Sequence, residues 1–254
     1  MKHPNQLPTS APENWDKIAA KEELKAIKKE LLEQVIRLRA DGTKAILIVL
    51  QGMDASGKDG LTRAIFDGLS PDWVQVSSFK KPSDKEAAKD FLWRIHHEVP
   101  SKGMIGVFNR SHYEDILVPT VYKYITADVI EKRFDQINHF EQYLSENGVV
   151  IIKMFLNISK ARQEEKLIER IQLEDKHYKH SDGDWETREH WDKFMDAYAQ
   201  ILDQCNTPKW HVIPCDKSAY RNVTAANIVL KTLQGLELQY PPLKSGRFNK
   251  DSFK

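Results

Sequence analysis

The sequence has few cysteines and no long apolar run. Cys205 and Cys215 are the only cysteines among 254 residues, and they lack the spacing of a zinc site or a thioredoxin-like motif. Two thiols in a chain of this length suggest a reducing compartment, so we expect a cytoplasmic protein. The N-terminus lacks the apolar core of a signal peptide, and the longest apolar runs, such as residues 45–50, are far too short to cross a bilayer. We therefore expect no membrane partner.

The chain also lacks a strong net charge. Its 38 Lys and Arg residues balance 37 Asp and Glu residues, which gives a formal net charge of +1 at pH 7. This balance provides no overall attraction to nucleic acid or a membrane surface, so any affinity for a polyanion must come from local clusters of basic residues. A composition of 41% hydrophobic and 30% charged residues is sufficient for one sizeable core.

Apolar and amphipathic stretches alternate along the chain. The expected strands cover residues 45–50, 74–79, 104–108, 149–156 and 210–213. The expected helices cover residues 58–68, 84–98, 127–146 and 219–234, with two more helical stretches before the last strand. Strands separated by helices indicate an α/β fold with a doubly wound, five-stranded parallel sheet, whose ligand lies over the carboxyl ends of the strands.

The chain is expected to divide into three parts. Residues 1–42 form an N-terminal extension, with an extended arm at residues 1–15 and a helix at residues 21–39. This helix packs against the main domain or, as the less favoured alternative, against another subunit. Residues 43–240 form the main domain, and residues 241–254 form a C-terminal tail.

A glycine-rich stretch, GMDASGKDG at residues 52–60, connects the first expected strand to the next helix. Two glycines separated by four residues and followed by a lysine let backbone N–H groups point at phosphate oxygens, while Lys58 reaches the outer phosphates. Asp59 replaces the usual hydroxyl residue, and Asp54 lies inside the loop. A carboxylate and a phosphate charge ~4 Å apart repel by roughly 4 kcal/mol at an effective dielectric of ~20, so we expect Mg²⁺, or Mn²⁺ as a substitute, between them.

The alternative for this stretch is a strand-to-helix turn without phosphate chemistry. The flanking strand and helix favour a phosphate-binding loop, because this context is what confirms the motif. The remaining loop residues expected at the phosphate are Gly52, Ala55, Ser56, Gly57, Asp59 and Gly60.

A second group of charged residues follows the third expected strand. Arg110, Glu114 and Asp115 are expected at the carboxyl edge of the sheet, beside the phosphate-binding loop. A planar guanidinium suits bidentate phosphate binding, and the two acids can hold Mg²⁺ opposite Asp54, an arrangement that spreads charge over a transferring phosphoryl group. A surface loop with salt bridges explains these residues equally well.

A basic stripe follows the fourth expected strand. Ser159 can cap a helix at this point. Arg162, Lys166 and Arg170 recur on it at four-residue steps and share one face. Such a helix, within a lid at about residues 160–190, would close over a chain of phosphates and expel water. A solvated helix face paired with neighbouring glutamates is the alternative.

Lys80 and Lys81 follow the second expected strand and lie on the same edge of the sheet. They are candidates for a further phosphate contact. The alternative is a solvated strand end.

Five motifs, in order along the chain, resemble the family-2 polyphosphate kinases. The resemblance covers roughly residues 36–236, and its most specific element is the loop, because nucleotide kinases generally carry a hydroxyl residue at the position of Asp59. The motifs are GMDASGKDG (52–60), FLWRIH (91–96), FNRSHYED (108–115), FLNISK (155–160) and WHVIP (210–214).

This resemblance implies a P-loop kinase-like fold with a helical lid and a Mg²⁺-dependent phosphotransferase activity. The implied reaction moves the terminal phosphoryl group of inorganic polyphosphate onto AMP or ADP, giving ADP or ATP, and also runs in reverse. Guanine nucleotides are further candidate substrates. Family members are typically homodimers or homotetramers, so the resemblance implies a homo-oligomer.

The resemblance also implies roles for individual residues. Asp54 and Asp115 would hold the metal ions and orient the acceptor phosphate. Lys58 and Arg110 would bind the transferring phosphates, and Arg170, on the lid, would close over them.

Other residues would select the substrates. Lys80, Lys81 and Lys166 would line a channel for the polymer, and Glu114 is typical of the subgroup that accepts both AMP and ADP. Thr120 stands where an arginine is expected, and Tyr178 where a tryptophan is common. These departures affect the expected chain-length preference or rate but not the expected reaction.

Two other functions remain open. One is an ATP-dependent kinase of a nucleotide or another small metabolite on the same scaffold. The other is a nucleotide-gated module that binds RNA or a protein through its basic rim. The sequence lacks an RNA-binding signature, so we expect no nucleic-acid partner.

Overall fold

Five parallel strands form a sheet in the order β2-β3-β1-β4-β5. The computed structural model describes residues 2–247, 249–250 and 252. β1 lies at the centre, pairs with β3 and β4, and is buried along its whole length, because both faces of a parallel sheet are normally covered. The strands are β1 (Ala45–Gln51), β2 (Val74–Ser78), β3 (Ile105–Asn109), β4 (Val149–Asn157) and β5 (Trp210–Pro214).

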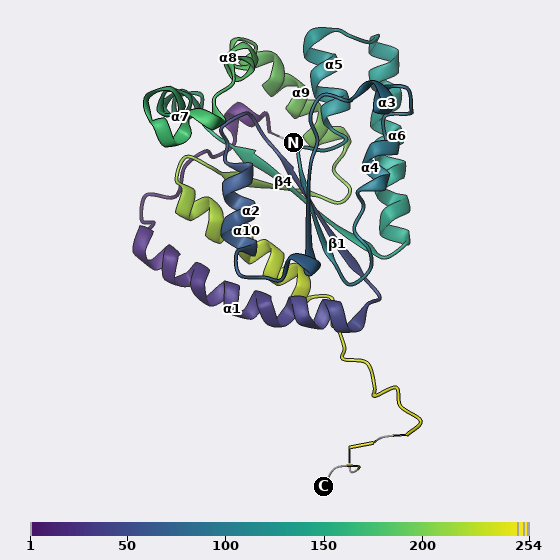
Figure 1. Ribbon diagram of the computed structural model, residues 1–254. Helices are drawn as coiled ribbons and strands as arrows, with labels where there is room; N and C mark the ends of the chain where they lie inside the picture. The colour runs from purple at the N-terminus through teal and green to yellow at the C-terminus, as the bar shows by residue number, and fades with distance from the viewer. Residues whose placement is uncertain (1, 248, 251, 253–254) are drawn as a thin grey trace.

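Helices cover both faces of this sheet (Figure 1). On one face α10 contacts α1, α2 and β5, and on the other α6 contacts β4 and α5. The predicted α/β fold with a parallel five-stranded sheet is therefore confirmed. None of the helices in the described residues is long and apolar enough to cross a membrane. The helices are α1 (Lys17–Asp41), α2 (Lys58–Phe66), α3 (Asp84–Ala87), α4 (Trp93–His97), α5 (Glu114–Tyr122), α6 (Ala127–Glu146), α7 (Lys160–Gln172), α8 (Asp182–Glu189), α9 (Trp191–Gln204) and α10 (Ser218–Gln234), with 3-10 turns at Pro4–Gln6, Pro71–Trp73 and Glu174–Lys179.

The long helix α1 packs along α10, so it lies on the main domain as favoured above. It begins where the Asp16 carboxylate accepts a hydrogen bond from the Ala19 N–H at 2.6 Å, and it ends at Gly42, whose φ of 64° suits glycine. Its buried apolar residues recur every three or four positions and form one stripe. They are Ile27, Leu31, Val35 and Leu38, with Ala20 buried nearer the start of the helix.

The N-terminal arm is bound to the main domain by hydrogen bonds. The side-chain amide of Asn157, at the end of β4, donates to the carbonyls of Pro4 and Leu7 at 3.2 and 3.1 Å. The N–H of Asp216 donates to the Thr9 carbonyl at 2.9 Å. The arm therefore covers the ends of β4 and β5, close to the ligand-binding edge of the sheet.

Two elements differ from the prediction. The single helix expected at residues 84–98 is two short helices, α3 and α4, because the Asp90 carboxylate accepts a hydrogen bond from the Leu92 N–H at 3.0 Å and stabilises a turn between them. Helix α5 was not expected. It contains Pro119, a residue that is unfavourable inside a helix and conceals it in the sequence.

Candidate active site

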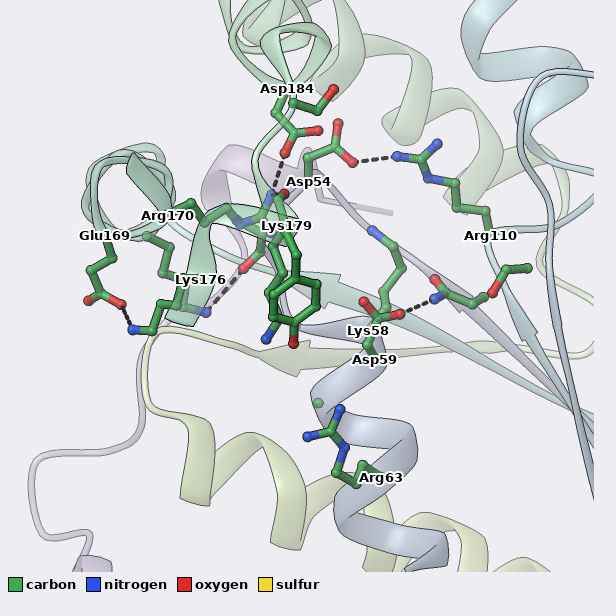
Figure 2. Close-up of a pocket in the computed structure, with 18 of the residues that line it drawn as sticks. Asp54, Lys58, Asp59, Arg63, Arg110, Glu169, Arg170, Lys176, Lys179 and Asp184 are labelled. Atoms are coloured by element: carbon green, nitrogen blue, oxygen red, sulfur yellow. Dashed lines mark hydrogen bonds and ion pairs between the residues drawn. The ribbon is translucent and has the colours of Figure 1, made fainter. Parts of the chain in front are cut away.

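A cavity of about 940 Å³ lies at the carboxyl ends of β1, β2 and β3, between the glycine-rich loop and the segment from α7 to α8 (Figure 2). Nine of the side chains that line it are basic and four are acidic. This excess of positive charge suits a polyanion. The basic residues are Lys58, Arg63, Lys80, Arg110, Arg162, Lys166, Arg170, Lys176 and Lys179, and the acidic ones are Asp54, Asp59, Glu169 and Asp184.

The glycine-rich loop joins β1 to the N-terminus of α2. A Cβ atom at Gly52 would lie 2.5 Å from the Leu156 carbonyl oxygen, so only glycine lets the loop approach β4 this closely. Gly57 and Ala55 both adopt positive φ angles, 97° and 61°. These turns place the start of α2, with its unpaired N–H groups, at the cavity.

Lys58 is the buried cation of this loop. It is 8% exposed, and its Nζ donates to the carbonyls of Gly52 and Met53 at 2.7 and 3.2 Å. Burial lowers the pKa of Lys58, while the neighbouring Asp54 carboxylate opposes this shift. The ammonium group is thus held next to the loop backbone at the edge of the cavity.

Arg110 joins the segment after β3 to the loop. Its Nη2 donates to the Asp54 carboxylate at 2.5 Å, and both side chains line the cavity (Figure 2). Burial opposes the charge of Arg110, but the Glu114 and Asp54 carboxylates raise its pKa. Burial raises the pKa of Glu114, which Arg110 and Lys58 counteract. Arg110 therefore remains a cation between two acids.

The structure does not bring Asp115 to the cavity. Its carboxylate lies 3.3 Å from Arg94 Nη2 and 3.9 Å from Arg133 Nη1. Helix α5 begins at Glu114, and consecutive helical residues point about 100° apart, so Asp115 faces α4 and α6 instead. Burial raises the pKa of Asp115, and the two arginines oppose this shift.

Helix α7 contacts the glycine-rich loop directly. Ser159 caps it by accepting a hydrogen bond from the Arg162 N–H at 3.1 Å, as predicted. Further along, Lys166 Nζ donates to the Ala55 carbonyl at 3.1 Å, and the Gln163 amide donates to the Asp54 carbonyl at 3.0 Å. The basic stripe therefore faces the cavity in part, while Arg162 also pairs with glutamates.

Arg170 is paired inside the cavity with a carboxylate from the next helix. Its Nη1 donates to Asp184, on α8, and to the Lys179 carbonyl at 3.1 Å (Figure 2). Burial and the neighbouring Asp54 carboxylate raise the pKa of Asp184, and Arg170 opposes the shift. Asp184 thus lies near the Asp54 carboxylate at the cavity (Figure 2).

The sequence matches a protein-family model over most of its length. This family model, described as Polyphosphate kinase 2, matches residues 14–241. The chain belongs to the polyphosphate kinase 2 family. An AMP/ADP-polyphosphate phosphotransferase of Meiothermus ruber is 43% identical over 227 residues, 89% of this chain and 85% of that protein. An ADP-polyphosphate phosphotransferase of Rhodopseudomonas palustris is 36% identical over 83% of this chain and 78% of that protein.

Solved structures of this family have the same fold. The crystal structure of polyphosphate kinase 2 from Arthrobacter aurescens matches with a TM-score of 0.88 and 36% identity, covering 96% of this chain and 93% of that one. A putative polyphosphate kinase 2 from Pseudomonas aeruginosa matches with a TM-score of 0.85 and 27% identity, over 91% of this chain and 49% of that one.

In this member of the polyphosphate kinase 2 family, most of the predicted site residues meet at the cavity. Gly52 and Ser56 are buried within the loop, whereas Lys81, Glu114 and Asp115 are not among the lining residues. The predicted residues that line the cavity are Asp54, Ala55, Gly57, Lys58, Asp59, Gly60, Lys80, Arg110, Lys166 and Arg170.

The acids of the cavity could contribute one or two ligands to a Mg²⁺ site that phosphate oxygens and water complete. Among the described residues, no group of three or more His, Cys, Asp or Glu side chains is arranged to hold a metal ion. Mg²⁺ commonly uses one or two carboxylates, with phosphate oxygens and water as its other ligands. Asp54 fits this requirement, since its carboxylate lines the cavity beside the glycine-rich loop.

Sequence reasoning missed several lining residues. Asn109 donates a hydrogen bond to the Asp59 carboxylate, and its place next to Arg110 was the available signal. Arg63 and Ser218 reach the cavity from α2 and α10. Asp184 lies in a polar stretch without periodicity, so only the tertiary structure reveals its position.

Proposed function

We propose that the chain transfers the terminal phosphoryl group of inorganic polyphosphate to AMP and ADP, reversibly and with Mg²⁺. The observation that carries this proposal is the excess of basic side chains in a cavity bounded by a glycine-rich loop and the start of α2. A single nucleotide needs few cations, whereas a polymer of phosphates extends along a row of them. Lys176, which pairs with Glu169, and Lys179 line the same cavity as Arg170.

The side chains at the loop act by position and charge. Lys58 and Arg110 bind phosphate oxygens and hold donor and acceptor in line, while α7 and α8 keep water away from them. Mg²⁺, held by Asp54 and by phosphate oxygens, would neutralise charge on the transferring group. The acceptor is already an anion, so the transfer requires no protein nucleophile.

Two observations support AMP and ADP as acceptors. The relative from Meiothermus ruber, at 43% identity, is named for both nucleotides. Glu114 stands in the string that resembles the subgroup accepting both, and it lies next to Arg110 at the start of α5.

The test is a nucleotide assay. Purified protein is incubated with Mg²⁺, long-chain polyphosphate and either AMP or ADP, and the products are separated by chromatography. We expect ADP from AMP and ATP from ADP. Transfer from ATP that persists in the strict absence of polyphosphate, with none from polyphosphate, would contradict the proposal.

The proposal extends to assembly, further acceptors and location. A homodimer or homotetramer is expected, and light scattering after gel filtration measures it. GMP and GDP enter the same nucleotide assay as further acceptors. Cys205 and Cys215 are free and buried, which supports a reducing compartment such as the cytoplasm.

A further inference from the structure

Arg221, on α10, is a buried cation beneath the glycine-rich loop. It is 4% exposed, and its Nη1 donates to the Ser56 carbonyl at 3.3 Å. Its Nε and Nη2 donate to the side-chain oxygen of Asn222 at 3.0 and 2.8 Å. Within the described part of the chain, no carboxylate pairs with this guanidinium, and it is not among the residues that line the cavity.

Two glycines of the loop lie against Arg221. A Cβ atom at Gly57 would lie 1.8 Å from Arg221 Nη1, so any side chain at this position would displace the guanidinium. A Cβ atom at Gly60 would lie 3.4 Å from Nη2, a tight contact. The absence of side chains at these two positions therefore lets the guanidinium lie directly under the phosphate-binding backbone.

Arg221 has no compensating anion among the described residues. A buried charge without a partner is costly, and burial lowers the pKa of Arg221. The nearby Cys215 thiol has its pKa raised to about 12 by burial, so it is neutral at pH 7. Lys166, whose pKa Arg221 lowers, is another cation. The phosphates expected on the open side of the loop are the remaining source of negative charge.

We propose that Arg221 is a positioning residue for phosphoryl transfer. Its guanidinium holds the Ser56–Gly57 backbone and provides positive charge beneath the loop, without touching the phosphates. This inference rests on the function proposed above, because the site is the same. This role can be distinguished from a purely structural one. If Arg221 supplies charge to the loop, removing that charge weakens phosphate binding but leaves the stability of the fold unchanged.

The experiment compares Arg221→Met, Arg221→Lys and a matched control, Lys231→Met, which removes an exposed cation from the same helix. Three quantities are measured for each variant: kcat and KM for polyphosphate, the dissociation constant of inorganic tripolyphosphate by calorimetry, and the melting temperature. We expect Arg221→Met to weaken tripolyphosphate binding and kcat/KM by at least tenfold. Its melting temperature should rise, or fall by no more than about 2 °C. Arg221→Lys should recover most of both losses, and the control should resemble the wild type.

Two results would overturn the inference. One is wild-type binding and kinetics in Arg221→Met. The other is a melting temperature that falls together with activity in both Arg221 variants, which indicates a purely structural role. The binding measurement separates this inference from the proposed function: a wild type that binds tripolyphosphate but transfers nothing refutes the function alone, and the effect of Arg221 on binding is still measured.

Discussion

Lys153 Nζ lies 2.6 Å from a carboxylate oxygen of Glu141, and both side chains are completely buried behind the segment that carries Arg110. Glu141 also contacts that segment, since the Tyr113 hydroxyl donates to it at 2.7 Å and His112 Nε2 lies 3.0 Å away. A network that spans β4, α6 and the segment after β3 therefore supports Arg110. The φ angle of Arg110 is 61°, an uncommon value outside glycine.

Replacing one member of the Lys153–Glu141 pair should lower the free energy of unfolding more than replacing both. Lys153→Met leaves the Glu141 charge buried without its main partner and should lower the free energy of unfolding by about 3 kcal/mol. The double variant Glu141→Leu/Lys153→Met should cost less than that single change. Urea denaturation monitored by circular dichroism measures both, and additive losses would show that the two charges act independently.

Asp54 and Lys58 are expected to matter for rate rather than for folding. Asp54→Asn removes the acid proposed to hold Mg²⁺, and Lys58→Ala removes the buried cation of the loop. Each should lower turnover by at least ~100-fold, a barrier increase of about 2.7 kcal/mol, while the circular dichroism spectrum stays unchanged. The measurement is the initial rate with polyphosphate and ADP. Near-normal rates in either variant would refute the assigned role.

Lys166 should make polyphosphate binding sensitive to pH. Burial, together with the Arg221 and Arg162 charges, lowers its pKa to about 8, and Cys215 and Asp216 oppose this shift. A lysine with a lowered pKa loses its charge as pH rises through that value. The KM for polyphosphate should therefore increase above pH 8, by up to about tenfold at pH 9.

Arginine keeps its charge over this range, so Lys166→Arg is the matched variant. Its KM should stay low from pH 7 to 9, whereas that of Lys166→Met should be high throughout. A wild-type profile that persists in Lys166→Arg would assign the titration to another group.

The glycine-rich loop could be predicted because its signal is local. A strand, two glycines, a lysine and a helix follow one another within 22 residues of sequence, from Ala45 to Phe66, and the structure keeps that order. The parallel sheet was predictable for the same reason, since each strand is an apolar run bounded by polar turns. Side-chain direction was less accessible. Asp115 points away from the cavity because α5 begins at Glu114, and the sequence does not indicate this helix start.

Contacts between distant segments could not be predicted. Arg221 reaches Ser56 across 165 positions of the chain, and no periodic pattern connects the two. The same holds for Asp184, which the position of α8 brings to the same cavity as Asp54. The roles predicted for the lining residues stay predictions until the variants are measured.

The pair formed by Arg170 and Asp184 should limit the affinity for polyphosphate. Asp184 neutralises Arg170, so Asp184→Asn makes the charge of the Arg170 guanidinium available to the phosphates without changing the shape of the cavity. The KM for polyphosphate should fall about fivefold, since a unit charge ~4 Å from a phosphate is worth about 1 kcal/mol in an aqueous dielectric. Steady-state kinetics at constant ionic strength measures this effect, because salt screens it. In the Arg170→Met background the same substitution should change KM much less. An equal fall in both backgrounds would mean that Asp184 acts on the phosphates directly and not through Arg170.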